Sequence, residues 1–251
     1  QQDRIIDEQR REVETLSENY SVNLSNVTKR NSQNTVSRLL LDNTTLSYNY
    51  NTSDGRNPQY RFQDNWNYNA SARYNLTVRS VGFLRPMQFL DNVPVVNLMS
   101  GLQLGYMPNN VTFGASTRRS YEERKRRIIG DEEEEPLQQT HSFTYNTNFG
   151  FGYNLTRSVS ASFQSENVYD LARASIIEGT ETGIDSTAFT TRNSFDVFGD
   201  LLSGELSPRQ SSRTENFTAG WQPRFNDIGA LDWLTYNSRY SGGFRWENTP
   251  F

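Results

Sequence analysis

Hydrophobic and polar side chains alternate without interruption along residues 65–79, NWNYNASARYNLTVR. Aromatic or aliphatic residues occupy every second position from Trp66 to Val78, and Asn, Ser, Arg or Thr occupy the positions between them. A period of two is typical of a β-strand whose two faces meet different surroundings. Because ordinary strands average roughly five to six residues, this segment predicts an unusually long strand with one apolar and one polar face.

The same alternation recurs in other segments. It is clear at 143–155, 159–165 and 234–246, and weaker near 40–50 and 217–221. We therefore predict an all-β fold of about eight antiparallel strands, forming a single unit over residues 1–251. The predicted strands lie at approximately residues 19–28, 40–51, 64–79, 103–118, 141–155, 158–167, 214–223 and 232–246.

The predicted connections alternate in length. A tight turn joins two strands at 156–158, whereas long loops are expected at 120–140 and 167–213, the second with a short helix near Asn193–Leu202. Long loops at one end and short turns at the other are typical of outer-membrane barrels. The apolar connection 80–102 departs from this rule, and we expect short amphipathic pieces there that plug or line a wall.

Two environments explain a long two-faced strand. A tilted strand crosses a bilayer in about 9–11 residues, and in lipid only a closed barrel satisfies every backbone group. A soluble sandwich would give the same alternation with its apolar face turned inward. The strand length, the aromatic content and a polar face of uncharged Asn, Ser and Thr favour a transmembrane β-barrel segment. Its small polar positions fit an arc of a much larger barrel better than a filled eight-stranded one.

In a membrane barrel, one face of each strand contacts lipid and the other faces the lumen. The residues predicted to face lipid are Trp66, Tyr68, Tyr74, Leu76, Val78, Phe143, Tyr145, Phe149, Phe151, Tyr153, Leu155, Tyr236, Tyr240, Phe244 and Trp246. The residues predicted to face a wet lumen are Asn65, Asn67, Asn69, Ser71, Arg73, Asn75, Thr144, Asn146, Asn148 and Asn154.

Composition further limits the classes of protein to which this chain can belong. The 251 residues carry a net charge of −4 and no cysteine, which gives no sign of nucleic-acid binding and excludes a disulfide scaffold. No run of about eighteen apolar residues exists, so a membrane-spanning helix is excluded. The mean hydropathy is −0.79 although 13% of the residues are aromatic. Strict alternation explains both values, because polar residues between the apolar ones lower the average.

Candidate chemistry is sparse, and we expect no enzyme, cofactor or metal site. His141 is the single histidine and has no nucleophile-elbow motif beside it, so we interpret it as structural. The acidic run 131–135 lacks calcium-loop spacing and follows a basic run at 124–127 that neutralises it. Four arginines are placed on polar faces, where they tune lumen charge or pair with acids: Arg73, Arg79, Arg118 and Arg119.

The segments YMPNNVTF at 106–113 and YNLTRS at 153–158, in order with several longer stretches, resemble the SprA/Sov family, the outer-membrane translocon of the type 9 secretion system in Bacteroidetes-type bacteria. The resemblance covers most of 40–246, and these two segments carry it best. The other stretches are TLSYNYNTSDGRNPQYRFQDNWNYNASARYNL, FLRPMQFL, LQLGYMPNNVTFGASTRRSYEERKRR, HSFTYNTNFGFGYNLTRSVSASF and TENFTAGWQPRFNDIGALDWLTYNSRYSGGFRW.

The resemblance implies a very large single-chain barrel in the bacterial outer membrane. In that family the pore exports folded cargo proteins to the cell surface, is gated by accessory secretion-system proteins, opens sideways and is linked to gliding motility. Lipid, cargo and accessory proteins are then the expected partners. Two alternatives remain open: another outer-membrane porin or nutrient receptor, and a soluble secreted β domain that binds glycans through exposed Trp and Tyr.

Overall fold

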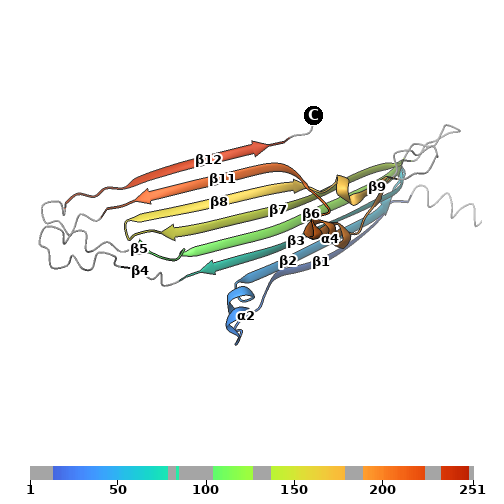
Figure 1. Cartoon of the computed structure of the whole chain (residues 1–251). Coiled ribbons are helices and arrows are strands. Elements are labelled where there is room, and N and C mark those ends of the chain that lie inside the picture. The colour runs from blue at the N-terminus through green and yellow to red at the C-terminus, as the bar shows by residue number, and fades with distance from the viewer. Residues whose placement is uncertain are drawn as a thin grey trace, which may run out of the picture.

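Eight long strands form one antiparallel sheet, in the order β1-β2-β3-β6-β7-β8-β11-β12 (Figure 1). The computed structural model describes residues 14–78, 83–84, 104–126, 137–178, 189–223 and 233–248. Each long strand pairs with the next long strand along the chain, so the sheet is a meander, and this confirms the predicted all-β class. The sheet is not closed, because β1 and β12 each have one neighbour among the described strands.

The strands are longer than average, as their alternating sequences predict. Their bounds are β1 Leu16–Thr28, β2 Thr44–Arg56, β3 Tyr60–Thr77, β6 Asn110–Arg126, β7 Gln138–Asn154, β8 Val159–Asp170, β11 Arg209–Trp221 and β12 Ser238–Glu247. The remaining elements are α2 Thr35–Leu40, β4 Phe83–Leu84, β5 Leu104–Gly105, η2 Arg173–Ser175, β9 Ile176–Glu178, β10 Phe189–Thr191 and α4 Ser194–Ser203.

The predicted loop at 120–140 is wrong in its first third, because β6 continues to Arg126. The charged stretch stays in the sheet because it pairs with β3. Glu122 and Arg124 share one face of it and form an ion pair at 3.8 Å. The predicted strand 103–118 is also wrong as one element, because β5 and β6 are separate. The last strand begins later than predicted, so Tyr236 precedes β12.

The predicted separation of long loops and short turns is not seen. At the end where α4 lies, β2 and β3 are joined by residues 57–59 alone. At the opposite end, long connections at 29–43 and 222–237 lie beside the tight β7–β8 turn. Most of the apolar connection 80–102 lies outside the described residues, except that Phe83–Leu84 pairs with Leu104–Gly105.

The register of the sheet keeps like side chains on like faces. Tyr48 on β2 pairs with Ala70 on β3, and Ala70 pairs with Thr117 on β6. Thr117 pairs in turn with Tyr145 on β7. Side chains point to alternate faces along a strand, so the apolar residues of the sheet gather on one face, here called the aromatic face, and the Asn, Ser and Thr residues on the other, the polar face.

The buried core lies at one end of the aromatic face, under α4. Asn193 caps this helix by accepting a 3.1 Å hydrogen bond from the Phe195 amide, and Gly204 ends it with a φ of 80°. Val197 packs with Phe143 and Leu171, and all three are fully buried. Among the described residues, no helix is long and apolar enough to span a membrane.

Candidate functional site

The polar face is built from hydrogen-bonded amides and hydroxyls. The Asn51 side-chain amide donates to the Asn49 amide oxygen at 2.6 Å and to that of Asn67, across the strand pair, at 3.2 Å. Ser120 and Ser142 pair at 2.7 Å on the same face. All ten residues predicted to face a lumen lie on this face by register, while its contact with a wet lumen stays a prediction.

Two glycines let polar side chains lie directly against the backbone of this face. A Cβ at Gly114 would overlap the Asn148 amide, and one at Gly152 would overlap the Asn110 amide. Asn148 and Asn110 are cross-strand partners of these glycines, so each amide lies over the backbone opposite it. The polar face is therefore closely packed even though its side chains are small.

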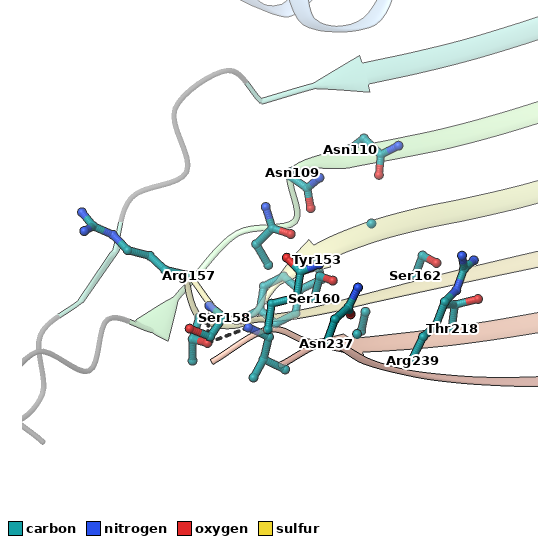
Figure 2. A pocket seen from close by; sticks show the side chains of 17 residues that line it. Asn109, Asn110, Tyr153, Arg157, Ser158, Ser160, Ser162, Thr218, Asn237 and Arg239 are labelled. Carbon is teal, nitrogen blue, oxygen red and sulfur yellow. Dashed lines mark hydrogen bonds between the residues drawn. The ribbon is translucent and has the colours of Figure 1, made fainter. Parts of the chain in front are cut away.

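An open hollow of about 930 Å³ lies on the polar face near the β7–β8 turn. Asn110, Ser162 and Thr218 reach it from three different strands, and Arg157 extends away from the other labelled side chains (Figure 2). Among the described residues that line it, none is a carboxylate, and Arg157 and Arg239 carry charge. The hollow is suited to water and hydrogen-bonding solutes.

The aromatic face carries an exposed apolar band that crosses the strands obliquely. On β2 the band runs from Leu46 to Tyr50. Followed across the paired strands β3 and β6, Leu46 lies level with Thr147 of β7, and Tyr50 lies level with Phe143. On β11 the band runs from Phe217 to Trp221, level with Phe151 and with the residue after β7, Leu155. Measured in β7 numbering, the band lies level with residues 143–147 on β2 and with residues 151–155 on β11. It is therefore displaced by eight residues over the five strand steps from β2 to β11.

This displacement gives the angle between the band and the strands. Eight residues at about 3.3 Å cover about 26 Å along a strand, and five steps at about 4.8 Å cover about 24 Å across the sheet. Between β2 and β11 the band thus makes about 45–50° with the line perpendicular to the strands, whereas on β12 its exposed residues reach back to Trp246, level with Thr147 of β7. The ion pair of Arg213 and Glu215 on the aromatic face of β11 lies toward the α4 end from Phe217, directly opposite Trp246 and Phe244 of β12.

The part of the aromatic face under α4, here called the covered end, has a different chemistry. Arg119 is 2% exposed; its Nε donates to His141 Nε2 at 3.0 Å and its Nη1 donates to Ser194 Oγ at 2.7 Å. The Tyr68 hydroxyl donates to the same Ser194 oxygen at 2.8 Å. An imidazole nitrogen that accepts is unprotonated, so this arrangement holds His141 neutral.

Aromatic rings replace a carboxylate around the Arg119 charge. Its guanidinium carbon lies 5.4 Å from the ring centre of Trp66 and 4.9 Å from that of Phe143, both within cation–π range. No ion pair of Arg119 is found in the part of the chain that the structure describes, and its Nη2 has no hydrogen-bond partner there. Taking a charge out of water is costly, so the buried Arg119 depends on its hydrogen bonds and on the facing rings.

Two sequence predictions are corrected at the covered end. Arg119 lies on the aromatic face and not on the polar one, because it pairs with Tyr68 and Phe143. Phe143 is fully buried beneath α4, so it does not face lipid. Phe198 of α4 packs edge-on against Phe143 and Tyr145, with ring centres 5.7 and 5.8 Å apart.

The other residues predicted to face lipid fall into three groups. Trp66, Tyr68 and Tyr145 belong to the covered end and are partly buried. Val78, Leu155 and Tyr236 lie just outside strand bounds. The remaining eight lie on the aromatic face away from α4, and lipid contact stays a prediction for them: Tyr74, Leu76, Phe149, Phe151, Tyr153, Tyr240, Phe244 and Trp246. Of these, Tyr153 also contacts β5, because its hydroxyl donates to the Gly105 carbonyl.

The titratable and metal-binding groups form no catalytic set in the described ranges. His141 and Ser142 point to opposite faces of β7, and Ser142 is bound to Ser120. Groups of three or more metal-ligating side chains are not found in the described residues, and the acidic run 131–135, Arg79 and Arg127 lie outside them. In the β1–β2 connection, hydrogen bonds from the Ser32 hydroxyl and amide hold the pKa of Asp42 below its ordinary value.

No protein-family model and no curated protein sequence matches this chain.

Proposed function

We propose that this chain forms part of the wall of an outer-membrane channel that exports folded proteins. The observation that carries the proposal is the oblique apolar band, backed by a continuous face of amides and hydroxyls. Strands cross the outer membrane at a tilt of about 35–45°, so the bilayer meets them along an oblique stripe. A soluble sheet that packs on a second layer has no need for such a stripe.

The uncovered length of the strands supports the same proposal. On β7, Tyr145 is the last residue that Phe198 contacts, and the strand ends at Asn154. Nine residues at about 3.3 Å span about 30 Å, or about 21–24 Å along the membrane normal at a tilt of 35–45°. The lipid-facing band of outer-membrane barrels is about 25 Å tall, so α4 and the covered end lie beyond the bilayer.

The two open edges support an arc rather than a complete barrel. Every residue of β1 and nearly every residue of β12 is exposed, and each strand has one paired side. In lipid an unpaired strand edge costs several kcal/mol for each unsatisfied group. We infer that further strands pair with both edges and complete a wider barrel with a water-filled lumen.

Protein export is favoured over a small-solute pore by the resemblance of 40–246 to the SprA/Sov translocons. The polar face is also suited to a conduit, because neutral amides and hydroxyls stay hydrated and hold passing cargo weakly. Trp66, Tyr68 and Tyr74 packed in a closed core between two sheets would have favoured the glycan-binding alternative. The described residues hold no second large sheet over the aromatic face, so that alternative gains no support.

Photocrosslinking in cells tests the proposal. A crosslinking residue is placed at Asn67 or Asn146 on the polar face, and a matched one at Phe149 on the aromatic face. With a tagged secreted protein stalled during export, we expect adducts from the two polar positions and none from position 149. Stalled export without polar-face adducts, combined with uptake of small solutes through the barrel, would favour a porin.

A further inference from the structure

Helix α4 has an apolar flank that its packing against the sheet does not use. Phe195 and Leu202 are 85% and 87% exposed, the largest values among the exposed large hydrophobic side chains of the described residues. They are seven residues apart, about two helical turns, so they lie one above the other on the helix surface. Contiguous apolar patches exposed to solvent mark contacts with a protein, a ligand or a membrane.

The side chains of α4 fall into three sectors around its axis. At about 100° per residue, Val197 and Phe198 share the sector that packs on the sheet, with Ser194. Phe195 and Leu202 lie on one flank, about a quarter turn away. Asp200 lies toward the opposite flank, and Asp196 points away from the sheet.

The contacts of α4 show which flank faces the apolar band. Val197 belongs to the buried cluster with Leu171, which directly follows β8 at the strand ends. Phe198 reaches Tyr145, which lies further along β7 toward the band. The rotation from Val197 to Phe198 therefore runs from the strand ends toward the band, and it continues to Leu202 and Phe195.

The acidic flank confirms this orientation independently. Asp200 pairs at 2.7 Å with Arg192, and the Arg192 guanidinium donates to the carbonyl of Ala174 in η2, beyond the end of β8. Asp200 thus faces the strand ends, and the apolar flank of α4 faces the band. Figure 1 shows α4 lying at the same end of the sheet as β9.

We propose that α4 is an interfacial helix whose Phe195 and Leu202 enter the boundary between lipid headgroups and acyl chains. This rests on the proposed function, because the boundary is where the uncovered length of the strands ends. An amphipathic helix in that position lies in the membrane plane with its apolar side chains buried about 5–10 Å deep. Because Ser194, Val197 and Phe198 fix α4 to the sheet, the helix sets the depth at which the barrel sits.

Single spin labels test this placement directly. The chain contains no cysteine, so Phe195→Cys, Leu202→Cys, Asp196→Cys and Phe149→Cys each give one labelled site in the full protein, reconstituted in phosphatidylethanolamine–phosphatidylglycerol vesicles. Each label is compared for collision with oxygen, which concentrates in lipid, and with a water-soluble nickel chelate. We expect an oxygen-to-nickel ratio at 195 and 202 several-fold above the ratio at 196 and approaching that at 149.

The reference at position 149 separates the two proposals. If 149 has the high ratio of lipid and 195 and 202 match 196, the interfacial helix is wrong and the barrel wall stands. If 149 also has the low ratio of water, both proposals are wrong. The four positions are exposed, so the labels remove no buried packing.

Discussion

The covered end and the apolar band lie on one face of one sheet and share a sequence pattern, yet their surroundings differ. Phe143 and Phe149 occupy equivalent positions of β7, six residues apart. The first is fully buried beneath α4, and the second is 42% exposed. Alternation decides the face of a side chain, but an element from elsewhere in the chain decides what covers that face.

The difference also explains where polar groups are tolerated. Arg119 and His141 lie on the aromatic face where α4 covers them and Ser194 accepts a hydrogen bond from Arg119. On the same two strands, the band residues are apolar, Ala or Thr. Charged side chains facing hydrocarbon are costly, so the boundary between the two regions marks where the account places the bilayer edge.

The largest effect is expected from removing the packing of the covered end. Phe143→Ala leaves a cavity against Val197 and Leu171 and should destabilise the protein by about 3–5 kcal/mol. Urea unfolding in detergent micelles measures the change. The control, Phe149→Ala, should cost clearly less because detergent or lipid fills the space. Equal losses for the two variants would contradict the distinction between the two regions.

A charge placed in the band should have the next largest effect. Phe149→Arg exposes a guanidinium to hydrocarbon and should cost about 2–4 kcal/mol near the bilayer midplane. Asn148→Arg, one residue away on the polar face, should change the stability little because water reaches it. Folded yield and unfolding in lipid vesicles give both values. Similar costs at 148 and 149 would mean that the faces share one environment.

A smaller effect is expected from loosening α4. Arg119→Lys keeps the charge but loses the planar fork that reaches His141 and Ser194 together, and lost hydrogen bonds to a charged group cost about 1.5–3 kcal/mol. Amide hydrogen exchange in α4 should accelerate, while exchange in β2 and β11 stays unchanged. Uniform acceleration across the sheet would show that Arg119 stabilises the whole fold and not the docking of α4.

The smallest effect concerns the β1–β2 connection. Ser32 Oγ donates to Asp42 at 2.6 Å and the Ser32 amide donates at 3.0 Å, and these bonds favour the carboxylate and lower its pKa. The stabilisation is therefore present above the unfolded-state pKa of Asp42, about 3.9, and is lost as the pH falls through the lowered pKa.

Proteolysis near 29–43 should thus increase below about pH 4, and an acid-active protease measures it. Asp42→Asn should remove most of this pH dependence. If proteolysis of the Asp42→Asn variant still increased below about pH 4, another titratable group would be responsible for the pH dependence.

Much of the fold follows from the period-two pattern, because alternation and strand pairing act together. Counting by twos from Phe113 also places Arg119 on the aromatic face, so its position was available from the sequence. The extension of β6 through Arg126 could not be predicted from the sequence, because a run of charged residues is typical of loops. Pairing with β3 keeps this run in the sheet. The docking of α4 on Phe143 joins segments far apart in the chain, which no local pattern reports.

The most direct test of the central claim is a scan of single spin labels along β7, at residues 146–154, in lipid vesicles. Accessibility to oxygen and to a water-soluble nickel chelate is measured at each position. We expect the two accessibilities to alternate along the strand. Accessibility to oxygen should be high at 147, 149, 151 and 153, and accessibility to the nickel chelate should be high at 146, 148, 150 and 152. Nickel accessibility at 149 and 151 equal to that at 148 and 150 would contradict a lipid-facing aromatic face.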